Sequence, residues 1–161
     1  DREAAESLTA DPAAFADLHK LLLIPHEAVG AEIAVMTARL LAKNGAQSPW
    51  IGYLTLEGSE RRVVGTCGFN GGPDTTGTVE LAYFAFPQEE GRGIATAMAL
   101  ALVRLASEAQ PELVAVRAHR LPERNASCRV LEKVGCQCVG TATDLDEGLV
   151  WRWELSLPAT A

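Results

Sequence analysis

The sequence predicts a single mixed domain, an α/β or α+β fold with a mostly antiparallel sheet. Helical periodicity dominates the start of the chain, whereas short alternating runs separated by turn residues dominate from Trp50 onward. The apolar fraction of 48% in 161 residues is typical of a globular chain with one hydrophobic core. No repeat or linker divides the chain, so residues 1–161 are expected to form one domain.

Charge and composition narrow the functional classes. A formal net charge of −7 argues against a nucleic-acid partner, because phosphate contacts require clustered Lys and Arg. No apolar run is long enough to cross a bilayer and the first residues do not resemble a secretory signal, so we expect a cytoplasmic protein without membrane contact. The four cysteines include no C-x-x-C pair, which indicates reduced, packed thiols and no metal site.

Two helices are predicted before the first strand. Asp11-Pro12 predicts a helix start, because a carboxylate cap precedes proline at the first helical position. Apolar residues then keep helical spacing until Pro25. A second helix is predicted over 27–43, with Asn44-Gly45 at its end. Residues 1–45 are therefore expected to form a helical region that covers a sheet.

The rest of the chain predicts six strands and two helices. Residues 57–60 provide a hairpin turn between the first two strands, and Pro87 ends the third. In the last strand, Trp151 and Trp153 alternate with polar residues, which indicates a packing role. The strands are predicted over 50–56, 62–69, 78–86, 112–119, 136–141 and 149–155, and the helices begin at Ile94 and Ala126.

Two glycines lie one residue apart where the long helix should begin. The first amides of a helix have no partner within it, and the helix dipole is positive at that end. Because Gly91 and Gly93 carry no Cβ, phosphate oxygens can reach these amides. Arg92 between them adds a donor for charge-assisted bonds. The stretch therefore predicts an anion-binding turn.

Three patterns compete for this turn. A nucleotide P-loop requires Gly-Lys-Ser/Thr at its end, but Ile94-Ala95 follows Gly93. A dinucleotide fingerprint requires an early parallel βαβ unit, whereas this turn follows predicted hairpins. The pattern Gln/Arg-x-x-Gly-x-Gly/Ala is matched at every specified position by residues 88–93.

That third pattern resembles the coenzyme A pyrophosphate loop of the GNAT N-acetyltransferases, which joins their fourth strand to their third helix. The block ASCRVLEKVGC at 126–136 is similar to the family's fourth helix. VVGTCGFNGGPDTTGTVELAY and EGLVWRWEL are similar to the subgroup that includes the ribosomal-protein N-terminal alanine acetyltransferases. The resemblance covers roughly residues 50–156, which it marks as a coenzyme A-binding core.

The resemblance implies a twisted, mostly antiparallel sheet that is splayed between the family's strands 4 and 5, with helices on both faces. It implies direct transfer of an acetyl group from acetyl-CoA to a primary amine, on a protein N-terminus or a small molecule. It also allows a homodimer. The alternative is a non-catalytic coenzyme A-binding or sensing domain of the same fold. A dinucleotide oxidoreductase is disfavoured by the order of the strands.

The resemblance also assigns residues to the coenzyme. The main chain of 84–86 is expected to pair with the pantetheine arm like an added strand and to polarise the thioester carbonyl. The asparagine that the subgroup places before its fourth helix is displaced by one position here, which leaves Arg124 for a phosphate and Asn125 for the coenzyme or a helix cap. The expected coenzyme residues are Phe84, Ala85, Phe86, Gln88, Glu89, Glu90, Gly91, Arg92, Gly93, Ile94, Ala95, Thr96, Arg124 and Asn125.

Two residues are candidates for the chemistry. The family often uses a strand-four glutamate to accept the amine proton through water, and Glu80 lies on that strand, with a solvated or salt-bridged carboxylate as the alternative. Many relatives use a tyrosine of the fourth helix to protonate the leaving thiolate, but Leu131 stands there. Ser127 either donates a hydrogen bond to the sulfur or only caps the helix. His119 lies at the end of the strand predicted over 112–119 and is interpreted as structural, with contact to the substrate or the coenzyme as the alternative.

Overall fold

The computed structural model describes residues 2–23, 47–145 and 147–158. Six strands form one sheet in the order β1-β2-β3-β4-β6-β5, in which only β3 and β4 run parallel. The strands are β1 (Gly52–Glu57), β2 (Arg62–Phe69), β3 (Thr78–Ala85), β4 (Ala115–Arg120), β5 (Gln137–Asp144) and β6 (Gly148–Ser156). The helices are α1 (Arg2–Ala10), α2 (Pro12–His19), the short 3-10 helix η1 (Pro87–Glu89), α4 (Ile94–Ala109) and α5 (Ala126–Val134). The mixed, mostly antiparallel architecture predicted from the sequence is confirmed.

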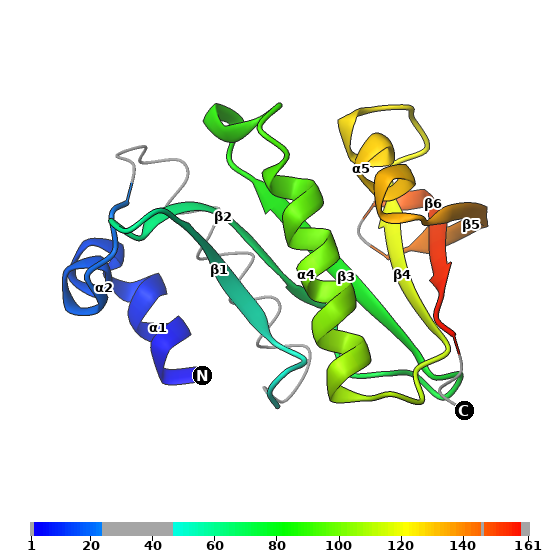
Figure 1. The fold of residues 1–161 in the computed structure, drawn as a ribbon, viewed down its shortest axis with the longest axis horizontal. Helices are drawn as coiled ribbons and strands as arrows, with labels where there is room; N and C mark the ends of the chain where they lie inside the picture. Colours follow the sequence, from blue (N-terminus) through cyan, green and yellow to red (C-terminus); the bar gives the residue numbers. More distant parts are fainter. Residues whose placement is uncertain (1, 24–46, 146, 159–161) are drawn as a thin grey trace.

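The sheet divides where β3 meets β4. Their parallel pairing consists of three residue pairs and ends at Glu80 and Arg117. Beyond this point, β3 stays paired with β2 as far as Ala85, and β4 stays paired with β6 as far as Arg120. Figure 1 shows the two strands close at one end and well separated at the other. The predicted splay is therefore present, and the family's strands 4 and 5 correspond to β3 and β4.

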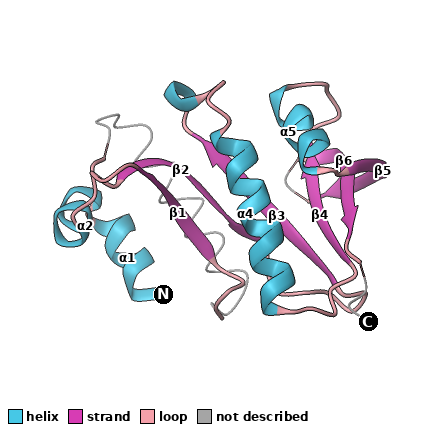
Figure 2. Cartoon of the chain, in the orientation of Figure 1, coloured by secondary structure: helices cyan, strands magenta, loops and turns pink. Residues whose placement is uncertain are grey.

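Helices α4 and α5 cover one face of the sheet (Figure 2). Met98 and Leu102 of α4 are buried in one core cluster with Val79 and Leu81 of β3. Trp153 of β6 belongs to the same cluster, so the packing role predicted for the last strand is confirmed. Because side chains alternate across a strand, the residues of β3 between these core positions face the other side of the sheet.

Helices α1 and α2 form a second, smaller cluster with the sheet. Leu8 and Phe15 are buried together with Val63 and Phe86, and Phe84 packs against them. Figure 1 shows the two helices beside β1, away from the edge formed by β5. Since Phe84 faces away from α4, helices occur on both faces of the sheet, as predicted.

The N-terminal region differs in part from the prediction. Asp11 caps α2 as expected, because its Oδ1 accepts a hydrogen bond from Ala14 N at 2.9 Å. The helix ends at His19 and not near Pro25, because Lys20 adopts a left-handed conformation and Leu22 instead forms a parallel bridge with Arg62. α1 was not predicted. The helix expected over 27–43 lies outside the described residues.

The strands agree more closely with the prediction. β4 begins at Ala115, three residues later than predicted, because the two preceding amides are used elsewhere: Leu113 N donates to Gln110 O and Val114 N donates to Gly77 O. β5 extends to Asp144, three residues beyond its predicted end. In the described part of the chain no strand precedes β1, and Leu22 forms an isolated parallel bridge with Arg62 of β2.

Candidate active site at the fork of the sheet

A cleft of about 420 Å³ lies at the fork between β3 and β4. Its walls come from four elements: the end of β3, the first turn of α4 with the loop before it, the end of β4, and one side of α5. The lining residues are Tyr83, Phe84, Ala85, Glu89, Glu90, Gly91, Gly93, Ile94, Ala95, Thr96, Arg120, Ala126, Ser127, Arg129, Val130 and Lys133. The cleft is thus bordered by the N-termini of both helices.

The N-terminus of α4 presents its amides to this cleft. Gly91 and Gly93 have φ angles of +76° and +81°, a region that favours glycine, and a Cβ on either would meet no atom within 4 Å. The protein itself therefore leaves this space open. Gly93 provides no side-chain cap, and the bond from Ala97 N to Gly93 O at 3.0 Å begins the helix, so the amides of residues 94–96 are the unpaired donors of a first turn. Such a site favours an anion.

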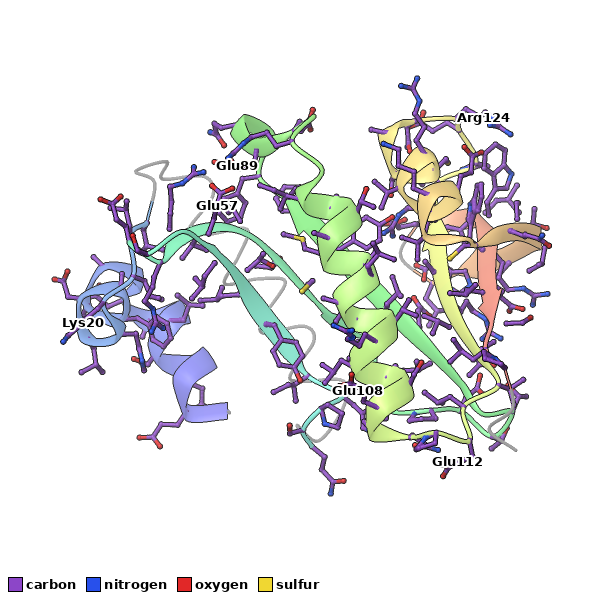
Figure 3. The ribbon with its side chains drawn as sticks, in the orientation of Figure 1. Lys20, Glu57, Glu89, Glu108, Glu112 and Arg124 are labelled. Carbon is purple, nitrogen blue, oxygen red and sulfur yellow. The ribbon has the colours of Figure 1, made fainter. Side chains whose placement is uncertain are left out.

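An ion-pair network holds the loop that precedes α4. Glu89 is buried, with only 2% of its side chain exposed, and binds both Arg62 of β2 and Arg92. The same two arginines bind Glu57 at the end of β1, with Arg92 Nη2 2.8 Å from Glu57 Oε1. Figure 3 shows Glu57 and Glu89 side by side near the head of α4. The hydrogen bond from Arg62 is the main cause that lowers the pKa of both carboxyl groups.

The N-terminus of α5 is closed by its own cap. Asn125 Oδ1 accepts hydrogen bonds from Ser127 N at 3.0 Å and Cys128 N at 3.2 Å. Arg124 is 76% exposed and lies 3.0 Å from Glu132 Oε1, and Figure 3 places it on the outer side of α5. Two amides of the first turn are therefore satisfied by the cap, and Ser127, Arg129 and Lys133 of this helix line the cleft.

Three of the cleft residues form a connected polar cluster. Arg120 extends from the end of β4, and its guanidinium carbon lies 4.5 Å from the ring centre of Tyr83 on β3. Arg120 Nε donates to Ser127 Oγ, which lies 3.1 Å from Tyr83 Oη. Arg120 Nη1 donates to His119 O at 2.7 Å, whereas the buried Nη2 has no hydrogen-bond partner among the described residues. The cluster bridges the two arms of the fork.

Glu80 lies at the last paired position before the fork, on the face opposite α4. Its Oε1 accepts a hydrogen bond from Asn70 Nδ2 at 2.8 Å, and its Oε2 lies 3.2 Å from His119 Nδ1. Both carboxylate oxygens are therefore held by side chains from different elements. The Glu80 side chain keeps 29% of its surface exposed, so water and a solute have access to it.

A model of the family described as "Acetyltransferase (GNAT) domain" matches residues 1–137. The chain belongs to the GNAT acetyltransferase family. A comparison with curated proteins finds no match. The family assignment therefore rests on the family model, and the fold is tested further by the solved structures.

Several solved GNAT structures share the fold. A GNAT acetyltransferase from Bacillus anthracis has a TM-score of 0.61 at 18% identity, covering 83% of this chain and 76% of that chain. The ribosomal-protein-S5-alanine acetyltransferase from Vibrio fischeri has a TM-score of 0.59 at 14% identity, covering 78% and 69%. The aminoglycoside acetyltransferase AAC(6')-Ib in complex with coenzyme A has a TM-score of 0.55 at 23% identity, covering 65% of each chain. These likenesses support the GNAT fold predicted from the sequence.

The structure of this GNAT chain brings only part of the predicted site to the cleft. The predicted residues that line it are Phe84, Ala85, Glu89, Glu90, Gly91, Gly93, Ile94, Ala95, Thr96 and Ser127. The predicted residues outside the lining are Glu80, Phe86, Gln88, Arg92, Arg124 and Asn125. Each arginine in the second group is exposed and has a carboxylate partner, Glu57 for Arg92 and Glu132 for Arg124.

Sequence reasoning missed the cations that do line the cleft. Arg129 and Lys133 are four residues apart on α5, the spacing that puts two side chains on one helix face, and this signal was available in the sequence. Arg120 gave no such signal, because its position depends on where β4 parts from β3. Tyr83 gave no signal either, because its approach to Arg120 depends on the same separation of the strands.

The main chain at the end of β3 also differs in detail from the prediction. Phe86 N donates to Val64 O at 3.1 Å, so this amide is used within the sheet. Main-chain groups alternate in direction along a strand, so Tyr83 and Ala85 turn theirs toward the fork. These two residues, and not Phe86, supply the free edge in this structure.

The described residues offer no group of three or more His, Cys, Asp or Glu side chains that could hold a metal ion. In the same part of the chain, no helix has both the length and the apolar character needed to cross a bilayer. All four cysteines are free thiols, and Cys138 alone is exposed.

Proposed function

We propose that this protein is an N-acetyltransferase that moves the acetyl group of acetyl-CoA directly to a primary amine. The observation that carries the proposal is the cleft at the fork, where the open first turn of α4 meets the free edge of β3. A diphosphate and an extended amide-containing arm are the ligand parts that match these two features. The GNAT family membership supports the same reading.

The coenzyme would lie with its diphosphate against the α4 amides. The open space above Gly91 and Gly93 admits phosphate oxygens, and Arg129 and Lys133 add positive charge from the facing helix. The pantetheine arm would follow the main chain of Tyr83 and Ala85 into the fork. Neighbouring structures named as complexes with coenzyme A or acetyl-CoA support this choice of co-substrate.

Glu80 would accept the proton of the attacking amine through a water molecule. Its carboxylate is fixed by Asn70 and His119 at the point where the strands part, so it can act from the face opposite the coenzyme. As the amine attacks, negative charge develops on the thioester oxygen, and a main-chain amide of the free β3 edge would stabilise it. Direct transfer requires no covalent intermediate on the protein.

Two acceptor classes are consistent with the family. Neighbouring structures are named for a ribosomal-protein alanine, an aminoglycoside and spermidine, which include both protein and small-molecule amines. A net charge of −7 favours a cationic acceptor. The free thiols support the cytoplasm as the compartment.

Two measurements test the proposal. Isothermal titration calorimetry with coenzyme A should show one saturable site, and NAD should show none. A thiol-release assay with acetyl-CoA should respond to at least one amine in a panel of peptides with free N-terminal alanine or serine, spermidine and an aminoglycoside. Coenzyme binding without thiol release on any amine would favour the non-catalytic coenzyme-binding alternative, and absence of coenzyme binding would refute both.

A further inference from the structure

Charge changes at three atoms during acetyl transfer: the amine nitrogen, the thioester oxygen and the sulfur. The residues described so far interact with the first two. Glu80 faces the amine proton, and the β3 edge faces the oxygen of the thioester. The third charge develops on sulfur when the carbon–sulfur bond breaks. Leu131, at the family position for a thiolate-protonating tyrosine, is fully buried in the apolar core and carries no proton to donate.

We propose that Tyr83, oriented by Ser127 and Arg120, donates a proton to the departing sulfur of coenzyme A. The inference rests on the proposed acetyl transfer. All three side chains line the cleft, and Arg120 and Tyr83 come from the two arms between which the thioester must pass. The cluster therefore lies where the leaving group is formed.

The direction of the hydrogen bonds follows from the chemistry of the three groups. A guanidinium only donates, so Ser127 Oγ must accept the bond from Arg120 Nε. The serine proton is then free to point at Tyr83 Oη, 3.1 Å away. With its oxygen acting as acceptor, Tyr83 directs its own proton elsewhere, and among the described residues its acceptor is Ser127 O at 3.3 Å. This is a long bond that a better acceptor can replace.

Arg120 supplies the charge that this step needs. Its guanidinium lies over the Tyr83 ring, and its Nη2 is buried without a hydrogen-bond partner among the described residues. A positive charge at this distance, 4.5 Å from the ring centre, favours the charged form of a neighbouring acidic group, such as the Tyr83 phenolate or a departing thiolate beside it.

The step balances as follows. The carbon–sulfur bond of the tetrahedral intermediate breaks, and its electron pair moves to sulfur. The Tyr83 proton moves to the same sulfur, and coenzyme A leaves as a neutral thiol. The resulting phenolate is stabilised by the Ser127 hydroxyl and by the Arg120 guanidinium. Water returns a proton to Tyr83 after the coenzyme has left, so no further reactant is required.

The first test compares Tyr83→Phe with the matched control Tyr53→Phe. Tyr53 of β1 donates its hydroxyl to Pro49 O and does not line the cleft, so the control loses a hydroxyl of the same kind. We expect kcat to fall about 100-fold in Tyr83→Phe, the usual contribution of a general acid, with KM for acetyl-CoA within about threefold. If the wild type transfers acetyl groups and Tyr83→Phe has the same kcat, the inference about Tyr83 is overturned while the proposed function stands.

The second test does not depend on the acceptor or on turnover. The thiol of bound coenzyme A is titrated by its thiolate absorbance on the wild type, Arg120→Met and Arg120→Lys. A nearby cation favours the thiolate, so the bound thiol should ionise about one pH unit higher on Arg120→Met than on the wild type. Arg120→Lys should recover part of this difference because it retains the charge. Identical titrations of all three complexes would overturn the inference, whereas failure of the wild type to bind coenzyme A would overturn the proposed function as well.

Discussion

The two helix N-termini that border the cleft are built in opposite ways. α4 begins at Gly93, which is in the left-handed region and offers no side-chain cap. α5 begins at Asn125, whose amide oxygen accepts bonds from two amides of the first turn. Both helices point their positive ends toward the same space, but α5 has two of its first amides bonded to a capping side chain, whereas α4 has none.

Under the proposed function, this difference gives α4 the role of binding the coenzyme and α5 the role of supporting the cleft. An uncapped first turn loses the stabilisation of a cap, which is typically about 1 kcal/mol, and this loss is reversed when an anion binds. A capped first turn keeps that stabilisation in the free protein and holds its side chains in place. In this protein α4 supplies main-chain donors, whereas α5 supplies Ser127, Arg129 and Lys133 from a fixed position.

The largest expected effect comes from closing the α4 terminus. Gly93→Val places a branched side chain in the open space above the first turn, and Gly148→Val is the matched control with a φ of +74° and the same open surroundings in the β5–β6 turn. Both variants should lose about 1–2 kcal/mol of unfolding free energy from the left-handed conformation. Only Gly93→Val should also bind coenzyme A about 100-fold more weakly, because one or two bonds to a charged group are lost.

Calorimetry with coenzyme A and chemical denaturation measure the two effects separately. If Gly93→Val and Gly148→Val bind coenzyme A with the same affinity, the uncapped terminus of α4 does not bind the coenzyme.

The next effect concerns the network that holds the α4 loop. Glu89→Gln keeps the shape of the side chain but removes the charge that binds Arg62 and Arg92. We expect coenzyme A to bind about 10-fold more weakly, because the loop amides lose part of their preorganisation. The control is Glu108→Gln, which removes an exposed pair with Arg104 at the far end of α4, as Figure 3 shows. Unchanged affinity in Glu89→Gln would assign the network to stability alone.

A smaller effect is expected at the α5 terminus. Asn125→Ala should lower the unfolding free energy by about 1 kcal/mol, equivalent to about 2–4 °C in Tm, through loss of the cap. Asn125→Ser retains a capping oxygen and should restore most of this loss. Because the amide oxygen of Asn125 is already bonded to Ser127 N and Cys128 N, coenzyme affinity should change by less than about threefold. A larger loss of affinity would show that Asn125 contacts the coenzyme directly.

The smallest expected effect is a dependence of stability on pH. The hydrogen bond from Arg62 holds the pKa of Glu89 below its usual value of 4.5 in the folded protein. The stabilisation from this carboxylate is therefore complete above about pH 4.5 and is lost as the pH falls through the lowered folded value. Urea denaturation below pH 4.5 should show a steeper loss of unfolding free energy in the wild type than in Glu89→Gln.

The difference between the two curves is the informative quantity. Other carboxyl groups titrate in both proteins, including Asp74, whose pKa is lowered to about 2 chiefly by the hydroxyl of Thr76. Parallel curves for the wild type and Glu89→Gln would indicate that Glu89 is no better stabilised in the folded protein than in the unfolded chain.

The parts of the site that follow from local sequence were predictable, and the parts that depend on strand pairing were not. Gly91 and Gly93 are recognisable because the requirement for a positive φ and an absent Cβ is local to the turn. Arg92 lies between them, and its guanidinium donates a hydrogen bond to Glu57, which is 35 positions away in the sequence. Glu57 lies close to Arg92 because it is at the end of β1, where the β1–β2 hairpin turns. Local reasoning has no means of finding that partner.

The fold shows the same division. The hairpin strands and α5 were predicted within a few residues because turns and caps mark their ends. α1 was missed because its sequence contains one large apolar residue, Leu8, which packs in a core cluster. A single large apolar residue gives no helical periodicity that can be recognised in the sequence. Arg120 and Tyr83 face each other only because β3 and β4 part after Glu80, a property of the sheet and not of either strand.

The junction between β3 and β4 has a mechanical consequence. Through the sheet, the unit β1-β2-β3 is joined to the unit β4-β6-β5 by three residue pairs at one end only. A ligand that binds beyond these three pairs and contacts both β3 and β4 would stabilise the association of the two units. While it is bound, such a ligand would therefore also contribute to the stability of the sheet.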